Sequence, residues 1–256
     1  MNKFITFAKK ESMCRLMQSV RLLDLIGMVE IVKNIEGIRS RLPMSVELVA
    51  VSKTHPADYV VEAYSCGQRI FGENKVQEMC EKHEALKDSC PDIKWHLIGH
   101  LQTNKVKYIT SFVDMIQSVD SLKLLAEIDK HAKKDGRVVK CLFEMHIASE
   151  ETKFGLDREE LVQILESDEF KAMQNVKICG LMGMATNTDD TDKVRADMRS
   201  LKETFDFVKK NYFAKDLDFR EISMGMSSDW KIAIQEGSTM VRIGSTIFGK
   251  RNYNVQ

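Results

Sequence analysis

The chain has 256 residues with 38 basic and 38 acidic side chains, so its formal net charge is zero. Without a basic excess, binding to nucleic acid through bulk charge is not expected, because phosphate neutralisation needs clustered positive charge. Apolar residues make up 43% of the chain and charged residues 30%, and no stretch approaches the ~20 uncharged apolar residues of a membrane span. The composition therefore excludes a membrane-spanning protein and indicates a globular protein of one or two domains.

The N-terminal segment differs from the rest of the chain. Residues 1–27 carry a small basic excess and lack the uninterrupted apolar core of a signal peptide. From Met28 onward, apolar residues recur at helical spacing as far as Leu42, and Pro43 ends the pattern. We therefore predict a variable N-terminal leader over residues 1–27 and a folded domain over residues 28–256, whose first helix begins at Met28.

The cysteines give no sign of disulfides or of a metal site. None of them stands in a C-x-x-C pair, and a chain of this size does not need disulfides for stability. The six are Cys14, Cys66, Cys80, Cys90, Cys141 and Cys179. We expect reduced thiols, and hence a cytoplasmic protein without a bound metal.

Eight short apolar runs alternate with segments of helical periodicity. The runs cover residues 46–51, 68–71, 93–98, 115–119, 138–147, 176–182, 220–223 and 239–243. Glycines that end helical segments stand at Gly67, Gly136 and Gly237. Eight strand-then-helix units in a chain of this length predict a single-domain α/β fold, the (β/α)8 TIM-like barrel, with no residues left for a second domain.

In such a barrel the chemistry lies where the strands end and the loops to the helices begin. The first strand ends at Val51, and Lys53 follows almost directly. Apolar neighbours there would desolvate the amine and lower its pKa, which suits Schiff-base chemistry. A lysine that merely extends from a strand end into solvent is the alternative.

The second and third strand ends carry further polar residues. Glu73 and Asn74 follow the second strand, where Asn74 fits either the site or the N-cap of the next helix. His96 lies inside the third strand and is expected to be a hydrogen-bonded core histidine. His100 follows in the loop, without the partner spacing of a metal site.

The loops after the seventh and eighth strands share one chemistry of glycines, hydroxyls and charge. Glycines let backbone N–H groups approach a ligand, and hydroxyls add donors, so these loops predict a phosphate site. Tight turns without a ligand are the alternative. The candidate residues are Ser223, Met224, Gly225 and Met226 in the first loop and Arg242, Gly244 and Ser245 in the second. The side chains of Met224 and Met226 are expected to pack against the protein.

A Schiff-base lysine facing a phosphate site fits two chemistries. One is that of a class I aldolase, which acts on a phosphorylated sugar. The other is binding of pyridoxal 5′-phosphate (PLP), an aldehyde that carries a phosphate, through Lys53. The residues by themselves leave both open.

Six motifs, taken together, are specific to one family. They are LVAVSKT (48–54), GQRIFGEN (67–74), WHLIGHLQ (95–102), GLM (180–182), SMGMS (223–227) and VRIGSTIFG (241–249). With these motifs in order and without large gaps over residues 28–253, the chain resembles the PLP homeostasis protein family, single barrels related to alanine racemase.

The resemblance implies a PLP barrel of fold type III, like the N-terminal domain of alanine racemase. It implies that Lys53 forms the internal aldimine with PLP, that Asn74 lies beside the cofactor, and that residues 223–226 and 242–245 hold its phosphate. Lys75 departs from the family pattern, which has tyrosine there, so the resemblance implies no role for an aromatic ring at this position. The leader before Met28 matches nothing in the family.

The resemblance further implies a protein of PLP (vitamin B6) homeostasis and amino-acid balance rather than an enzyme with an established reaction. Its expected partners are PLP and, as recipients of the cofactor, PLP-dependent apo-enzymes. Nucleic acid and membrane are not expected as partners, and a monomer is favoured. The alternatives are a PLP-dependent racemase or decarboxylase and, from a different class, a class I Schiff-base aldolase.

Overall fold

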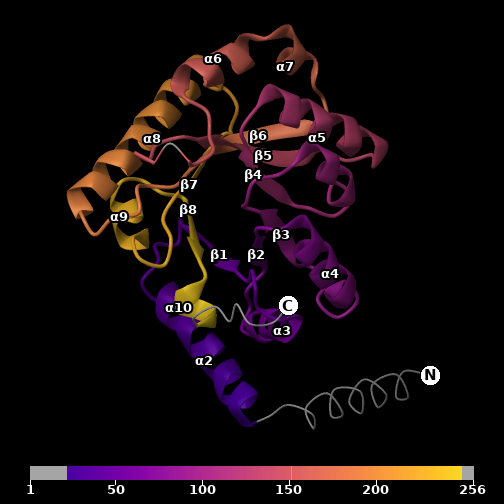
Figure 1. Cartoon of the computed structure of the whole chain (residues 1–256), viewed down its shortest axis with the longest axis vertical. Helices are drawn as coiled ribbons and strands as arrows, with labels where there is room; N and C mark the ends of the chain where they lie inside the picture. The colour runs from indigo at the N-terminus through magenta and orange to yellow at the C-terminus, as the bar shows by residue number, and fades with distance from the viewer. Residues whose placement is uncertain (1–21, 151, 250–256) are drawn as a thin grey trace.

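The computed structural model describes residues 22–150 and 152–249, and its centre is a closed barrel of eight parallel strands (Figure 1). Each strand pairs with the next along the chain, and the last pairs with the first. The strands are β1 (Glu47–Val51), β2 (Ile70–Glu73), β3 (Lys94–Leu97), β4 (Met115–Val119), β5 (Val139–Met145), β6 (Val176–Gly183), β7 (Glu221–Ser223) and β8 (Met240–Ile243). The predicted (β/α)8 barrel is confirmed, and each strand begins and ends within two residues of its predicted run.

Helices connect the strands on the outside of the barrel (Figure 1). They are α2 (Leu22–Arg39), α3 (Ala57–Ser65), α4 (Val76–Leu86), the 3-10 helix η1 (Thr103–Tyr108), α5 (Leu122–Lys134), α6 (Arg158–Glu166), α7 (Asp168–Ala172), α8 (Thr191–Asn211), α9 (Trp230–Gln235) and α10 (Ser245–Phe248). The third connection differs from the prediction, because η1 takes the place of an α-helix there. In the described part of the chain, no helix combines the length and the apolar character that crossing a membrane requires.

The first helix begins earlier than predicted. α2 already includes Leu22, whereas the predicted start was Met28, and it ends at Arg39 rather than Leu42. Residues 22–27 contain no proline, and Gly27 costs only about 1 kcal/mol in a helix interior, so α2 continues through them. Residues 1–21 of the predicted leader lie outside the described residues. The domain boundary at residue 28 therefore falls inside α2 and stays a prediction.

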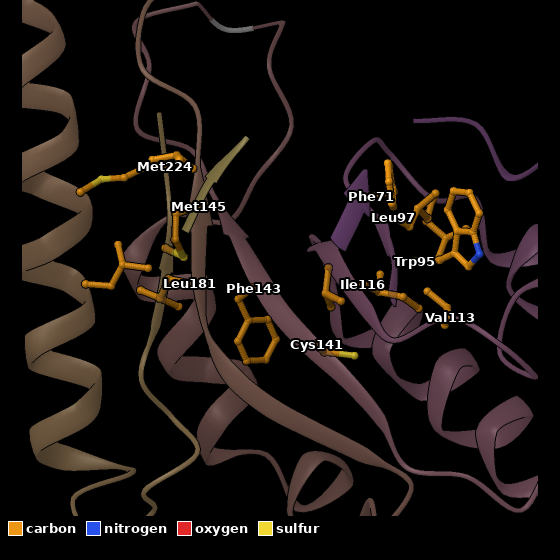
Figure 2. Close-up of a cluster of buried hydrophobic side chains, with 14 of the residues drawn as sticks. Phe71, Trp95, Leu97, Val113, Ile116, Cys141, Phe143, Met145, Leu181 and Met224 are labelled. Carbon is orange, nitrogen blue, oxygen red and sulfur yellow. The ribbon is translucent and has the colours of Figure 1, made fainter. Parts of the chain in front are cut away.

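Side chains alternate between the two faces of the barrel wall, as the pleat of a strand requires. Val49 and Met240 belong to a small apolar cluster inside the barrel. A much larger cluster packs the outer face of the wall against the helices and contains Phe71, Trp95 and Phe143 (Figure 2). This alternation decides which residues at the strand ends can reach a ligand.

The pairing of β5 with β6 contains a register shift, because Cys141 pairs with Ile178 whereas Leu142 pairs with Gly180. Gly180 has a φ of +154°. It also approaches β7 so closely that a β-carbon would lie 1.8 Å from the carbonyl oxygen of Glu221. Only glycine fits at this position of the wall.

Gly180→Ala is therefore expected to lower the free energy of unfolding by roughly 3 kcal/mol or more, because the clash is with backbone that cannot move aside. Gly37→Ala in α2 is the matched control. Apart from its chain neighbours and the backbone of its own helix, no atom of the described residues lies within 4 Å of its β-carbon position, so that change should raise stability by about 0.5–1 kcal/mol. Urea denaturation measures both, and a Gly180→Ala variant as stable as the parent would contradict the close approach.

Candidate functional site

Closure of the barrel brings together strand ends that are far apart in the sequence. β1 lies between β2 and β8, with Ala50 opposite Phe71 on one side and Ile243 on the other. β8 in turn pairs with β7. Because all strands are parallel, the residues that follow β1, β2, β7 and β8 meet at one end of the barrel, its mouth.

Lys53 stands two residues past the end of β1 and is half-buried. Val49 and Val51 both face the barrel interior, since they lie 3.0 and 3.4 Å from the β-carbon position of Gly72. The alternation carries Lys53 to the same face, at the mouth. Ser52 lies on the opposite, outer face and is fully buried. The structure thus places Lys53 at the mouth, and its covalent role stays a prediction.

Asn74 follows β2 and has an unused acceptor. α4 begins at Val76 with Lys75 in the N-cap position and no side-chain cap bond, so the alternative N-cap role of Asn74 is wrong. Its Oδ1 atom is buried and has no hydrogen-bond partner in the described structure. A ligand at the mouth can supply the missing donor. Lys75, at the position of the family tyrosine, is exposed.

The loops after β7 and β8 meet at Ser227, which the sequence analysis did not assign to the site. Its Oγ atom accepts hydrogen bonds from the N–H groups of Gly244 and Thr246 at 3.3 and 3.4 Å. Bonds of this length are weak. Two N–H groups that flank Ser245 therefore converge on a position where a phosphate oxygen is a stronger acceptor than a hydroxyl.

The remainder of the first loop is tightly packed. Gly225 has a φ of +95°, and a β-carbon on it would lie 2.5 Å from Cβ of Ala233. Met226 donates its N–H to the carboxylate of Asp229, so this group is already used. Met224 is buried as predicted, but Met226 is 38% exposed, and the prediction that its side chain packs is wrong.

Ser223 and Arg242 lie inside the barrel. The Arg242 guanidinium donates through Nη1 to O and Oγ of Ser223, both at 2.7 Å, and through Nη2 to O of Gly183 at 3.0 Å. Burial lowers the pKa of Arg242 to about 10, although Glu144 and Asp229 act in the opposite direction. Arg242 thus remains a cation at neutral pH and joins the ends of β6 and β7. Its direct contact with a phosphate stays a prediction.

From Ser223 a chain of polar side chains runs through the barrel interior. Ser223 Oγ donates to Gln117 Oε1 at 2.6 Å, and Gln117 Nε2 lies 2.9 Å from Nδ1 of His96. His96 Nε2 lies 3.4 Å from the carboxylate of Asp114, so the prediction of a hydrogen-bonded core histidine is confirmed. Burial opposes the charge of Asp114, but His96 and Lys140 outweigh it and lower its pKa to about 2.

Glu144 is a second residue that the sequence analysis missed. It is 3% exposed, and burial raises its pKa to about 7 against the attraction of Arg242. The signal for it is present in the sequence, because Glu144 is the lone acid in β5. An acid in a strand buried on both faces needs a reason to be there.

Within the described ranges, His100 and the cysteines do not form a metal site. Nδ1 of His100 lies 3.1 Å from the carboxylate of Asp120, and its ring stacks on Phe154 with the centroids 4.1 Å apart. Among the residues that the structure describes, no group of three or more histidine, cysteine or acidic side chains could hold a metal ion. The described cysteines are free thiols, and Cys14 lies outside the described residues.

Comparison with known sequences links this geometry to a family. The family of the alanine racemase N-terminal domain matches residues 26–252. A pyridoxal phosphate homeostasis protein of Aquifex aeolicus is 42% identical over 207 residues, which cover 81% of this chain and 88% of that protein. The human protein of the same name is 41% identical over 217 residues, with 81% and 77% covered.

Solved structures agree with the sequence comparison. PipY of Synechococcus elongatus PCC7942, solved with PLP bound, has a TM-score of 0.79 and 38% identity, covering 86% of this chain and 100% of its own. The alanine racemase of Bartonella henselae has a TM-score of 0.63 and 13% identity, covering 89% of this chain and 61% of its own. The latter likeness shows a shared barrel and no more.

Glu144→Gln is expected to change how stability depends on pH. The folded-state pKa of Glu144, about 7, lies above its ordinary value of 4.5, so the folded protein holds this proton more tightly than the unfolded chain does. The stability that results is fully present below pH 4.5 and is lost as the pH rises through 7. Between about pH 4.5 and 8, the free energy of unfolding should fall by roughly 1–3 kcal/mol less in the variant. If the free energy of unfolding, measured by urea denaturation, falls equally with pH in parent and variant, the raised pKa is contradicted.

Proposed function

Because the chain belongs to the family of pyridoxal phosphate homeostasis proteins, whose barrel is the alanine racemase N-terminal domain, we propose that it binds PLP at the barrel mouth through Lys53. One observation carries the proposal: Lys53 stands between two sets of hydrogen-bonding groups that are not fully used. On one side is Oδ1 of Asn74, which has no partner. On the other are the N–H groups of Gly244 and Thr246, both weakly bonded to Ser227.

These groups fit the chemistry of PLP. The cofactor carries an aldehyde, a ring hydroxyl and a phosphate, and the mouth offers an amine, an acceptor and converging N–H donors near the Arg242 cation. Bound PLP supplies an electron sink for reactions of amino groups. The proposed phosphate cradle keeps the predicted residues Ser223, Met224, Gly225, Met226, Arg242, Gly244 and Ser245 and adds Ser227.

We further propose that the protein holds PLP as a reserve for PLP-dependent apo-enzymes, in the cytoplasm and as a monomer. The support for a reserve is the homeostasis name that the Aquifex and human relatives share. The support for the cytoplasm is that cysteines in the described residues are free thiols. Residues 28–256 are the proposed PLP-binding domain, and residues 1–27 the proposed variable leader.

Reduction of the PLP-loaded protein with borohydride, followed by peptide mass mapping, is expected to place a pyridoxyl group on Lys53. This is the lysine that the wall alternation carries to the mouth. Lys53→Ala should lose the visible absorption of the bound cofactor and retain weaker binding, because the loops after β7 and β8 are unchanged. A pyridoxyl group on Lys105 or Lys153 in place of Lys53 would overturn the proposal, and a colourless protein labelled by a phosphorylated sugar would favour the aldolase.

Arg242→Ala is expected to weaken PLP binding by roughly 1.5–3 kcal/mol, the value of a lost charge-assisted hydrogen bond. Measurement of the same loss with pyridoxal, which lacks the phosphate, separates a contact with the phosphate from the other effects of Arg242. Most of it should be absent with pyridoxal, because the lost charge-assisted bond is to the phosphate, whereas any part common to both ligands reports how the contacts of Arg242 order the ends of β6 and β7. Any additional loss for PLP measures a contact with the phosphate. Unchanged affinity in a folded variant would exclude Arg242 from the site.

Incubation of the loaded protein with L- and D-amino acids in deuterated water is expected to show no racemisation at the ordinary enzymatic rate of about 1 s⁻¹ or faster. Racemisation needs an acid–base group on each face of the cofactor ring, and Lys53 can serve one. Exchange of the α-proton is followed by mass spectrometry and stereochemistry by chiral chromatography. Rapid turnover would replace the homeostasis role with a racemase.

A further inference from the structure

The turn that carries Lys53 has an unusual backbone. Thr54, the next residue, has a φ of +65°, and no other non-glycine residue in the described ranges has a positive φ. A β-branched side chain is disfavoured in this region, where glycine or asparagine is the usual occupant. Such a conformation persists only where surrounding contacts enforce it, and it is concentrated at functional sites.

Two charged side chains of α4 enforce it. The α-carbon of Lys53 joins two peptide groups, one that contains the carbonyl of Ser52 and one that contains the N–H of Thr54. Nζ of Lys82 donates to O of Ser52 at 2.7 Å. Oε1 of Glu78 accepts from N of Thr54 at 2.6 Å. Both peptide groups that set the direction of the Lys53 side chain are thus fixed by ionic hydrogen bonds.

The two charged groups are also joined to each other and to β2. Nζ of Lys82 lies 2.8 Å from Oε1 of Glu78 and 2.7 Å from Oε1 of Glu73. The same Glu73 oxygen accepts from Oγ of Ser52 at 2.7 Å. All three N–H groups of the Lys82 ammonium therefore have an acceptor, and its side chain is only 6% exposed.

This network lies behind the wall rather than in the mouth. Ser52 and Glu73 face outward toward α4, whereas Lys53 continues the inner face of β1. Burying a lysine with two carboxylates is no more stabilising than apolar packing would be. Stability by itself therefore does not account for the network, but a fixed direction for Lys53 does.

We propose that Lys82, Glu78 and Glu73 are positioning residues, which hold the turn from behind so that Nζ of Lys53 meets the aldehyde of PLP. The inference rests on the proposed function. In the step concerned, the neutral amine of Lys53 forms a carbon–nitrogen double bond with the aldehyde carbon, and the aldehyde oxygen leaves as water with the two protons that the amine loses. Nothing is oxidised or reduced.

Glu78→Ala tests the proposal, because it removes the acceptor of the Thr54 N–H and its side chain is 22% exposed, so the fold should tolerate the change. The two ligands are PLP and pyridoxamine 5′-phosphate, which has the same ring and phosphate but an amine in place of the aldehyde. PLP affinity and the rate of borohydride-trapped labelling of Lys53 should each fall about tenfold, or 1.4 kcal/mol. Affinity for pyridoxamine 5′-phosphate should stay within about twofold of the parent.

Three further variants make the test specific. Glu81→Ala, on the same helix with an exposed side chain bonded to Gln77, should leave both affinities unchanged. Glu78→Gln keeps an acceptor for Thr54 and should recover most of the labelling rate. Thr54→Gly added to Glu78→Ala should also recover part of it, because glycine adopts a positive φ without the network.

Equal losses for the two ligands in Glu78→Ala would show a general structural role and overturn the proposal, as would no loss for either. For Lys82 the variant is the double change Lys82→Met with Glu73→Gln, since Lys82→Met by itself leaves a buried carboxylate unpaired. This double variant should also lose affinity for PLP while it keeps its affinity for pyridoxamine 5′-phosphate. If the parent protein carries no trapped PLP on Lys53, the proposed function fails. If parent and variant are labelled equally, the proposed function stands and the positioning role fails.

Discussion

The parallel pairing of β1 with β8 is the constraint on which the site depends. Its register, with Glu47 opposite Met240 and Ala50 opposite Ile243, fixes the height of Lys53 relative to the loop after β8. The two strand ends touch, since the β-carbon position of Gly244 lies 3.1 Å from the carbonyl oxygen of Val51. A slip of one residue would turn every side chain of β1 to the other face and remove the amine from the mouth.

The same alternation accounts for the polar interior of the barrel. Inward-facing layers of such barrels are usually filled with branched apolar residues, but here Arg242, Glu144 and Gln117 occupy inward positions at mid-strand or strand end. Their burial costs free energy, which the hydrogen bonds of Arg242 to Ser223 and Gly183 partly offset. In return, a fixed charge lies where little water screens it, and its influence on a bound ligand is correspondingly strong.

The strands, their order and the mouth position of Lys53 could be predicted from the sequence, because each depends on a local pattern of apolar runs and period-two alternation. The direction of the Arg242 side chain could not be predicted. Its Gly-Ser neighbours are typical of a phosphate loop, yet β8 extends through Ile243 and turns the guanidinium into the barrel. Lys82 was missed because two of its three acceptors lie on Ser52 and Glu73, outside its own helix, whereas a helical pattern by itself places a lysine in solvent.

Because the barrel closes through its first and last strands, ligand binding also affects how long the protein persists in the cell. Lys53 follows β1 and Gly244 follows β8, so neither half of the chain contains both the amine and the loop after β8. A ligand that needs both binds the folded barrel and not the unfolded chain. At about a hundredfold excess over its Kd, it adds about 2.7 kcal/mol to the free energy of unfolding. Since cellular proteolysis removes unfolded chains, the abundance of this protein should follow the supply of its ligand.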